Sequence, residues 1–199
     1  MLMQALVFLA AYFLGAIPFP YLLARLKTGR DIREMGSGNV GATNVMRTSG
    51  KALGLLTLIL DTAKGSVAVL GAQAILQQEV YGAVAGFCAM LGHAYPVFLN
   101  FRGGKSVATG GGSFLVLSPF GILTSIAVFV VMVKISRIVS MSSIIASALF
   151  PLFAWFYGAG TGVVLWGGLS AALIVFRHKT NIQRLMEGTE KKIGEPKDV

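Results

Sequence analysis

The sequence predicts an all-α integral membrane protein, a bundle of about seven transmembrane helices. Of its 199 residues, 55% are hydrophobic and only 13% are charged, whereas a typical soluble domain is about a quarter charged. Apolar runs of about 17 to 25 residues, the length that crosses a bilayer as a helix, recur along the whole chain. We therefore expect one membrane-embedded domain spanning residues 1–199.

Seven apolar segments are the candidate spans. They are residues 3–24, 53–75, 81–99, 106–117, 120–133, 140–157 and 163–176. Segment 106–117 is at most about 18 Å long as a helix, so it is either a half-span or a tilted short crossing. Pro18 and Pro20 are expected to kink the far end of the first span.

The basic residues support this count, because they gather at alternate connections between the spans. Lys and Arg are concentrated in residues 25–51, 102–105, 134–137 and 177–199, whereas connections 77–79, 118–119 and 158–162 carry none. Cytoplasmic loops are enriched in Lys and Arg, so the pattern predicts an outside N-terminus and a cytoplasmic C-terminus. The same topology accounts for most of the net charge of +9, and we expect no nucleic acid partner.

The first of three polar segments is residues 36–47, GSGNVGATNVMR, here called the first motif. Closely spaced glycines allow successive backbone amides to converge on an anion. Neutral hydrogen-bonding side chains are supplied by Ser37, Asn39, Thr43 and Asn44. Arg47 adds a planar fork suited to phosphate. The motif is therefore an anion site or, as its turn-forming composition equally allows, a flexible loop.

The second motif is residues 92–112, GHAYPVFLNFRGGKSVATGGG. Its centre, residues 103–106, resembles the end of a P-loop but is not one, because Leu99 stands where that motif requires glycine. A glycine turn, Lys105 and a serine at the start of a short helix would still form an anion site at a helix N-terminus. The alternative is that Arg102 and Lys105 only follow the charge bias of cytoplasmic loops. His93 is as readily structural as reactive.

The third motif is residues 177–190, RHKTNIQRLMEGTE. On a helix, His178 and Asn181 would be neighbours three residues apart, and Leu185 would continue their face. One side of the helix would then present polar groups to a site while the helix rests on the bilayer surface. The alternative is an ordinary amphipathic helix that ends the last span.

Asp61 and Lys64 lie three residues apart inside the second span. Ionisable side chains at membrane depth are costly and are usually paired or functional. We expect the two to pair with each other, with a place near a substrate phosphate as the alternative.

The sequence lacks the residue patterns of a zinc site and of a serine hydrolase. Two histidines and one cysteine do not make a plausible zinc set, and neither H-E-x-x-H nor C-x-x-C is present, so no metal is expected. The G-x-S-x-G turn of a serine hydrolase is also missing from the sequence.

Taken together, SGNVGATNVMR, DTAKG, GHAYPVFLNFRGGKSVAT and RHKTNIQRLMEGTE resemble the bacterial PlsY family of glycerol-3-phosphate acyltransferases, over essentially the whole chain. The resemblance implies transfer of a fatty acyl group from acyl phosphate to glycerol 3-phosphate. The products would be 1-acylglycerol 3-phosphate (lysophosphatidic acid) and phosphate, in the first acylation step of phospholipid synthesis. The resemblance also implies a cytoplasm-facing site in the bacterial inner membrane, contact with membrane lipids, and no cofactor. It leaves room for a hand-over of the donor from an acyl-phosphate-producing enzyme.

The resemblance and the motifs together assign the site residues. Catalytic roles are expected for Ser37, Arg47, Lys105, His178 and Asn181. Substrate binding is expected for Asn39, Gly41, Thr43, Asn44, Lys64, His93, Gly103, Gly104, Ser106, Thr109 and Arg184. Structural roles are expected for Asp61 and Glu190. The base that deprotonates the acceptor hydroxyl is left open between His178, His93 and the departing phosphate.

A carrier of phosphate or of an organophosphate is the rival class, because transporters also use glycine-rich breaks and intramembrane charge. An internal repeat is its expected sign, and the sequence shows none. The polar motifs also gather on one predicted side, whereas alternating access needs polar groups on both. A purely structural membrane subunit would not need three such motifs.

Overall fold

The computed structural model describes residues 1–194, and over that range every regular element is a helix. The predicted all-α class is confirmed. The chain divides into two compact units, one formed by Met1–Leu117 and the other beginning at Ser118. The expectation of one domain over residues 1–199 stays a prediction.

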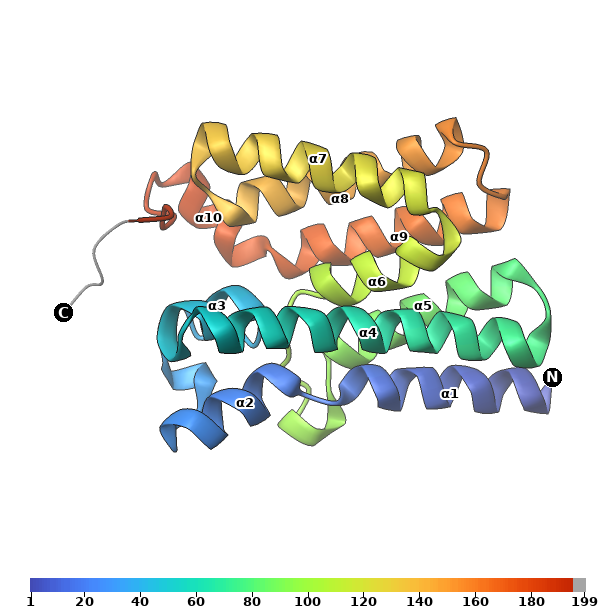
Figure 1. Ribbon diagram of the computed structural model, residues 1–199, viewed down its shortest axis with the longest axis horizontal. Coiled ribbons are helices and arrows are strands. Elements are labelled where there is room, and N and C mark those ends of the chain that lie inside the picture. The colour runs from blue at the N-terminus through green and yellow to red at the C-terminus, as the bar shows by residue number, and fades with distance from the viewer. Residues whose placement is uncertain (195–199) are drawn as a thin grey trace. The chain divides into compact units, whose positions relative to one another are not determined.

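The first unit is built around three longer helices that run alongside one another, with a shorter apolar helix packed against two of them. Its elements are α1 (Leu2–Ala16), α2 (Phe19–Thr28), η1 (Ile32–Glu34), α3 (Ala42–Ser49), α4 (Lys51–Leu76), α5 (Glu79–Ala94), η2 (Val97–Leu99) and α6 (Val107–Leu117). Helix α5 packs on α1, α4 and α6, and α4 packs on α6 and α3. The N-terminus and the α4–α5 connection lie at one end of this unit, and α2 and α3 lie at the other (Figure 1).

The predicted kink in the first span is present as a break between α1 and α2. Helix α1 ends at Ala16, because the next residue, Ile17, has a non-helical ψ of 115°, and α2 begins at Phe19, directly after Pro18. Pro18 and Pro20 lack the backbone N–H groups that would continue the hydrogen bonds of α1. Residues Leu2–Thr28 therefore make one candidate span in two pieces.

Small residues let the helices of the first unit approach closely. A Cβ atom added to Gly15 of α1 would overlap the backbone of Ala89 in α5. Likewise, a Cβ atom on Gly112 of α6 would overlap the backbone of Thr62 in α4. In a bilayer, where water does not drive apolar helices together, such close packing holds a bundle in register.

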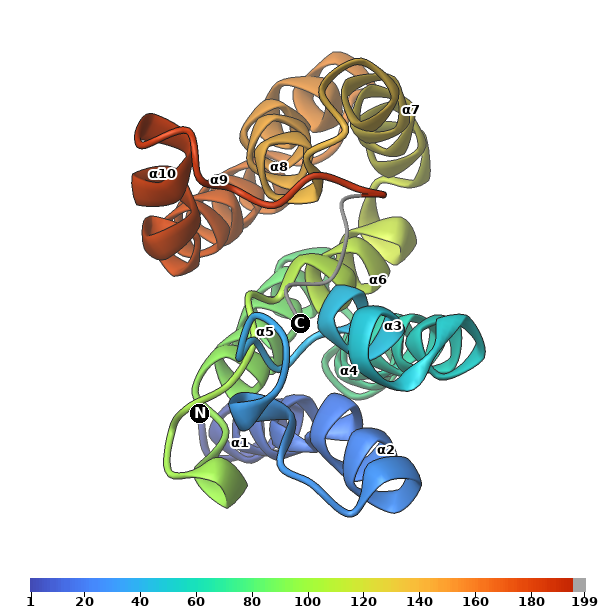
Figure 2. The ribbon, with the colours of Figure 1, turned by 90° about the vertical axis from the view of Figure 1, so that its left-hand side faces the viewer.

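The second unit is an antiparallel group of three long helices with a short fourth. Its elements are α7 (Pro119–Ser136), α8 (Val139–Phe156), α9 (Thr161–Arg177) and α10 (Lys179–Met186). Helix α8 packs against both α7 and α9 (Figure 2). Helix α10 bends away from α9 by 58° and packs on α8 and α9. On α7, Phe120, Leu123 and Ile126 are exposed by 50% or more, as expected for a helix that faces lipid.

Each of the seven predicted apolar segments contains a helix. Among residues 1–194, five candidate spans are long and apolar enough to cross a membrane, and α9 with α10 would make a sixth. Segment 106–117 became α6, an apolar helix of 11 residues, which is only about 16 Å long against a hydrocarbon core of about 30 Å. Its length favours the half-span of the two alternatives.

Candidate active site

The first motif is organised around the side-chain amide of Asn44, in the first turn of α3. Asn44 is 2% exposed. Its Oδ1 accepts a hydrogen bond from the backbone N–H of Ser37 at 3.0 Å, and its Nδ2 donates to the carbonyl oxygens of Met35 at 2.9 Å and Asn39 at 3.0 Å. A buried amide that is satisfied by backbone groups fixes a loop strongly. The predicted contact of Asn44 with substrate stays a prediction, since these bonds give it a structural task.

We expect Asn44→Asp to destabilise the protein by at least about 2 kcal/mol, because a carboxylate cannot donate and would face carbonyl oxygens. The measurement is the melting temperature of the purified protein in detergent. Ser49→Ala is the matched control, since Ser49 lies in the same helix and its hydroxyl contacts the side chain of Thr48, at 3.3 Å, and not the loop. A melting temperature that is equal in wild type and Asn44→Asp would contradict the structural task.

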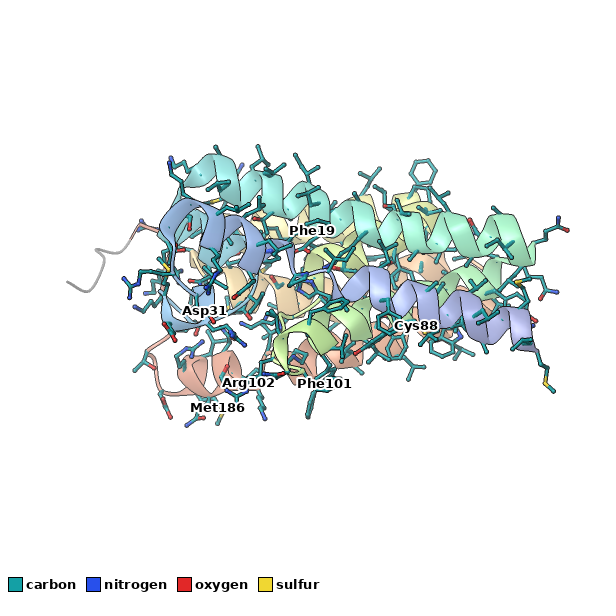
Figure 3. The ribbon with its side chains drawn as sticks, turned by 90° about the horizontal axis from the view of Figure 1, so that it is seen from below. Phe19, Asp31, Cys88, Phe101, Arg102 and Met186 are labelled. Carbon is teal, nitrogen blue, oxygen red and sulfur yellow. The ribbon has the colours of Figure 1, made fainter. Side chains whose placement is uncertain are left out.

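An ion pair that sequence analysis missed holds the segment before the first motif. Arg33 donates from Nη2 to Oδ2 of Asp31 at 2.6 Å, and its Nε lies 3.0 Å from the same oxygen. These hydrogen bonds lower the pKa of Asp31. The third nitrogen, Nη1, donates to the carbonyl of Leu99 at 3.4 Å. The spacing of Asp31 and Arg33, two residues apart, was the sequence feature that could have predicted this ion pair. Figure 3 labels Asp31 in this segment.

The first and second motifs meet through a small apolar cluster. It consists of Ala24, Ile32, Val40, Val45 and Leu99, all of them 6% exposed or less. Val40 belongs to the first motif and Leu99 to the second. A Cβ atom on Gly104 of the second motif would overlap the carbonyl oxygen of Val40. The structure thus brings together two motifs that lie about 60 residues apart in the chain.

The glycine turn of the second motif is attached to the end of α5. The backbone N–H of Gly104 donates to the carbonyl of His93 at 3.1 Å, and that of Gly103 donates to the carbonyl of Ala94 at 3.3 Å. Phe101 and Arg102 lie in the exposed loop that leads into the turn (Figure 3). Lys105 follows directly and is half-buried. The turn therefore presents a lysine from a fixed piece of backbone.

Ser106 and Thr109 are both interior. Ser106 has a φ of +61° and is 1% exposed, and its hydroxyl donates to the carbonyl of Met90 at 2.7 Å. Thr109 is fully buried, and its Oγ1 has no hydrogen-bond partner within residues 1–194. A left-handed backbone at a serine is uncommon and is held here by the contact with α5. The predicted substrate contacts of both residues stay predictions.

Asp61 and Lys64 pair as predicted, and the pair includes His93. The Nζ of Lys64 lies 2.8 Å from Oδ1 of Asp61 and 2.9 Å from Nδ1 of His93, and it donates to the carbonyl of Ile17 at 3.0 Å. All three side chains are 6% exposed or less. Phe19, at the break between α1 and α2, places its ring 5.7 Å from the same nitrogen (Figure 3). Lys64 and His93 are thus buried together, and their predicted substrate contacts stay predictions.

The third motif, in the second unit, is tied together by Glu190. Its Oε1 accepts hydrogen bonds from Ser140 and Asn181, each at 2.6 Å, and its Oε2 accepts from Nε of Arg184 at 2.7 Å. Glu190 thereby connects the start of α8 with α10, which is the geometry expected of its predicted structural role. At the start of α10, Nδ1 of His178 lies 2.8 Å from the carbonyl oxygen of Ile174.

The pKa of Glu190 gives a prediction for acid stability. Burial alone would raise this pKa, but the hydrogen bonds from Ser140, Arg184 and Asn181 outweigh burial and leave the pKa below its ordinary value of 4.5. A carboxylate with a lowered folded-state pKa contributes stability that is present above the ordinary value and is lost as pH falls through the lowered one. Glu190→Gln should therefore melt lower at pH 7 and lose less of its melting temperature on acidification below about pH 4.5.

Glu187→Gln is the control for this measurement. Glu187 is exposed on the same segment, and its carboxylate accepts a hydrogen bond from Gln183, one turn earlier on α10, at 2.9 Å. Melting temperatures taken between pH 3 and pH 7 should separate the two variants. Parallel curves for wild type and Glu190→Gln would show that the carboxylate does not carry this stability.

The predicted site residues thus fall into two groups. The first unit holds Ser37, Asn39, Gly41, Thr43, Asn44, Arg47, Asp61, Lys64, His93, Gly103, Gly104, Lys105, Ser106 and Thr109. The second unit holds His178, Asn181, Arg184 and Glu190. Within the first unit, Ser37 and Thr43 are exposed while Arg47 and Lys105 are half-buried. Accessible cations beside glycine-rich backbone suit a phosphate-bearing substrate.

A polytopic helical membrane protein whose first unit carries half-buried cations beside glycine-rich backbone is the class that this fold and these motifs define. The family model described as glycerol-3-phosphate acyltransferase matches residues 5–188, and the chain belongs to that family. The resemblance seen in the sequence is confirmed.

Curated relatives agree in length and sequence. The glycerol-3-phosphate acyltransferase of Syntrophotalea carbinolica is 47% identical over 189 residues, which cover 94% of this chain and 96% of the relative. That of Jannaschia sp. is 45% identical over 194 residues, which cover 97% of this chain and 94% of the relative.

Two crystal structures of PlsY (YgiH), an integral membrane glycerol 3-phosphate acyltransferase, are similar to this chain. The glycerol 3-phosphate form is 39% identical with a TM-score of 0.91, and the match covers 96% of each chain. The lysophosphatidic acid form is 37% identical with a TM-score of 0.87 and the same coverage. The chain is accordingly a multi-pass integral membrane protein.

Proposed function

We propose that this protein transfers a fatty acyl group from acyl phosphate to glycerol 3-phosphate, giving lysophosphatidic acid and inorganic phosphate. The observation that carries the proposal is the full-length likeness to two structures of one enzyme, described as its glycerol 3-phosphate and lysophosphatidic acid forms. These two molecules are the acceptor and the product of the proposed reaction.

The reaction is a direct displacement at the acyl carbonyl. A hydroxyl oxygen of glycerol 3-phosphate attacks the carbonyl carbon, a new ester C–O bond forms, and the bond to the phosphate oxygen breaks. Phosphate leaves with the electron pair. Because an acyl phosphate is already an activated mixed anhydride, no acyl-enzyme is needed, and catalysis consists mainly of positioning and charge stabilisation.

Lys105 and Arg47 are the residues to which we assign the phosphates. Both are cationic and half-buried. Lys105 follows a turn held by the two backbone hydrogen bonds to α5, and Arg47 lies in the last turn of α3. Ser37 is exposed near the start of the first motif, and in this proposal its hydroxyl orients the acceptor or the acyl carbonyl.

The proposal also covers the group that accepts the proton of the acceptor hydroxyl, for which His178, His93 and the departing phosphate are the candidates. Lys64 can only donate, so Nδ1 of His93 accepts its hydrogen bond, and in the neutral ring the proton sits on Nε2. In His178, Nδ1 lies 2.8 Å from the carbonyl oxygen of Ile174 and donates to it, because a carbonyl oxygen can only accept. In our proposal His178 or the departing phosphate accepts the hydroxyl proton, because Nδ1 of His93 is already the acceptor for Lys64.

The proposal includes the orientation and surroundings of the protein. We place the N-terminus outside and the C-terminus in the cytoplasm of a bacterial inner membrane, with the site facing the cytoplasm. Support comes from Arg25, Lys27 and Arg47, which lie on α2 and α3, at the end of the first unit opposite the N-terminus (Figure 1). The acyl chain lies among membrane lipids, and an acyl-phosphate-producing enzyme hands over the donor.

The test is product formation by the purified protein in detergent, given glycerol 3-phosphate with acyl phosphate, acyl-CoA or acyl carrier protein in separate reactions. The proposal expects lysophosphatidic acid and phosphate in equal amounts from acyl phosphate alone. Product only from a thioester donor would overturn the donor, and no product from any donor with folded protein would overturn the acyltransferase activity.

A further inference from the structure

Lys64 and His93 occupy a buried cluster that the reaction described above does not use. The side chains of Asp61 and Lys64 are 2% and 1% exposed, and that of His93 is 6% exposed. Charged groups at membrane depth are expensive to keep. The cluster joins three pieces of chain, namely α4, the end of α5 and the break between α1 and α2.

Lys64 and Asp61 both lie on the Nδ1 side of the His93 ring, because Nδ1 is 2.9 Å from Nζ of Lys64 and 3.5 Å from Oδ1 of Asp61. The ammonium donates to Nδ1 of His93 at 2.9 Å and to the carbonyl of Ile17 at 3.0 Å, while Asp61 balances its charge at 2.8 Å. With Nδ1 accepting, the neutral ring carries its proton on Nε2. Nε2 lies on the side of the ring away from Lys64, beside Gly104.

The Nε2 side of His93 supports the glycine turn of the second motif. A Cβ atom on Gly104 would overlap Nε2, so the backbone of the turn rests directly on the imidazole. The main chain of His93 holds the same residue, through the hydrogen bond from Gly104 N–H at 3.1 Å. The next residue along the chain is Lys105.

We propose that Lys64 is a positioning residue for acyl transfer: through His93 it holds the Gly103–Gly104 turn and so aims Lys105 at a substrate phosphate. This inference rests on the proposed function. Asp61 serves as the charge partner that makes a buried lysine tolerable. A misplacement of about 1 Å at a reacting group costs about 100-fold in rate, so a support of this kind has a measurable effect on catalysis.

The test is a double-mutant cycle between Lys64→Met and Lys105→Met, measured as kcat/KM for lysophosphatidic acid formation by the purified protein. We expect Lys64→Met to lower kcat/KM about 10- to 100-fold in the wild-type background but at most about threefold when Lys105 is already methionine. Both single variants should raise KM for the same phosphorylated substrate. If the Asp61–Lys64 ion pair only stabilised the fold, Lys64→Met would reduce the amount of active enzyme and leave KM unchanged.

Two further variants keep the test decisive. Lys64→Met leaves the Asp61 carboxylate buried without its partner, so if that variant does not fold, Asp61→Asn/Lys64→Met takes its place in the same cycle. Thr57→Val is the matched control, because Thr57 is fully buried on the same helix and bonds the carbonyl of Leu53 at 2.7 Å. Its effect should be equal in both backgrounds.

The outcomes separate this inference from the proposed function. Equal fold-losses from Lys64→Met in both backgrounds, with active wild-type enzyme, would overturn the positioning role and leave the acyltransferase intact. Wild-type protein that is folded but forms no product would instead overturn the proposed function.

Discussion

Lys105→Met is expected to lower kcat/KM for lysophosphatidic acid formation about 100- to 1,000-fold, with no change in melting temperature. The physical reason is that a single preorganised donor to developing negative charge is worth this much in a site that excludes water. Lys105 is half-buried and follows a turn that is fixed at Gly103 and Gly104. Kinetics with acyl phosphate and glycerol 3-phosphate, beside a thermal melt, make the measurement.

Lys51→Met is the control for the loss of positive charge as such. Lys51 is exposed at the first residue of α4, outside the second motif, and its loss should change kcat/KM by less than about twofold. Arg47→Met should resemble Lys105→Met, because we assign both cations to phosphates. Wild-type turnover in Lys105→Met would reject the phosphate site.

Gly104→Ala should be nearly as damaging, although it adds only one methyl group. That methyl would overlap the carbonyl oxygen of Val40 and Nε2 of His93. Neither can give way cheaply, because Val40 is part of a buried cluster and the His93 ring is held by Lys64. We expect a loss of about 1–3 kcal/mol in stability and about 100-fold in kcat/KM, since the turn must shift and carry Lys105 with it.

Gly71→Ala provides the comparison for this substitution. Gly71 is an exposed glycine of α4, and a Cβ atom there would meet nothing within 4 Å among the described residues. Alanine is the better helix former by about 1 kcal/mol, so Gly71→Ala should be neutral or slightly stabilising. Equal activity in Gly104→Ala and wild type would show that the turn is not packed between the two motifs.

The fold could be predicted from the sequence because bilayer thickness limits the length of each apolar run. The break in the first span could also be predicted, since Pro18 and Pro20 lack the N–H groups that would continue the helix. The exact ends were not: segment 120–133 extends as α7 to Ser136, because its last turn is stabilised by backbone bonds that composition does not specify.

The candidate site could be predicted only where its contacts are local. Asp61 and Lys64 are three residues apart on one helix, so their pairing follows from helical geometry. His93 joins them from 29 residues away and Glu190 bonds Ser140 across 50 residues, contacts that depend on how helices pack. The internal role of Asn44 was also hidden, because its type fits a ligand contact and a buried loop support equally well.

The most direct test of the central claim is made in sealed liposomes that contain the purified protein, with glycerol 3-phosphate and acyl phosphate added outside. Lysophosphatidic acid and glycerol 3-phosphate trapped in the lumen are then measured in the same sample. If the protein is an acyltransferase, lysophosphatidic acid forms continuously, and the lumen traps no more glycerol 3-phosphate than that of protein-free liposomes. Accumulation of glycerol 3-phosphate in the lumen without lysophosphatidic acid would contradict it and identify a carrier.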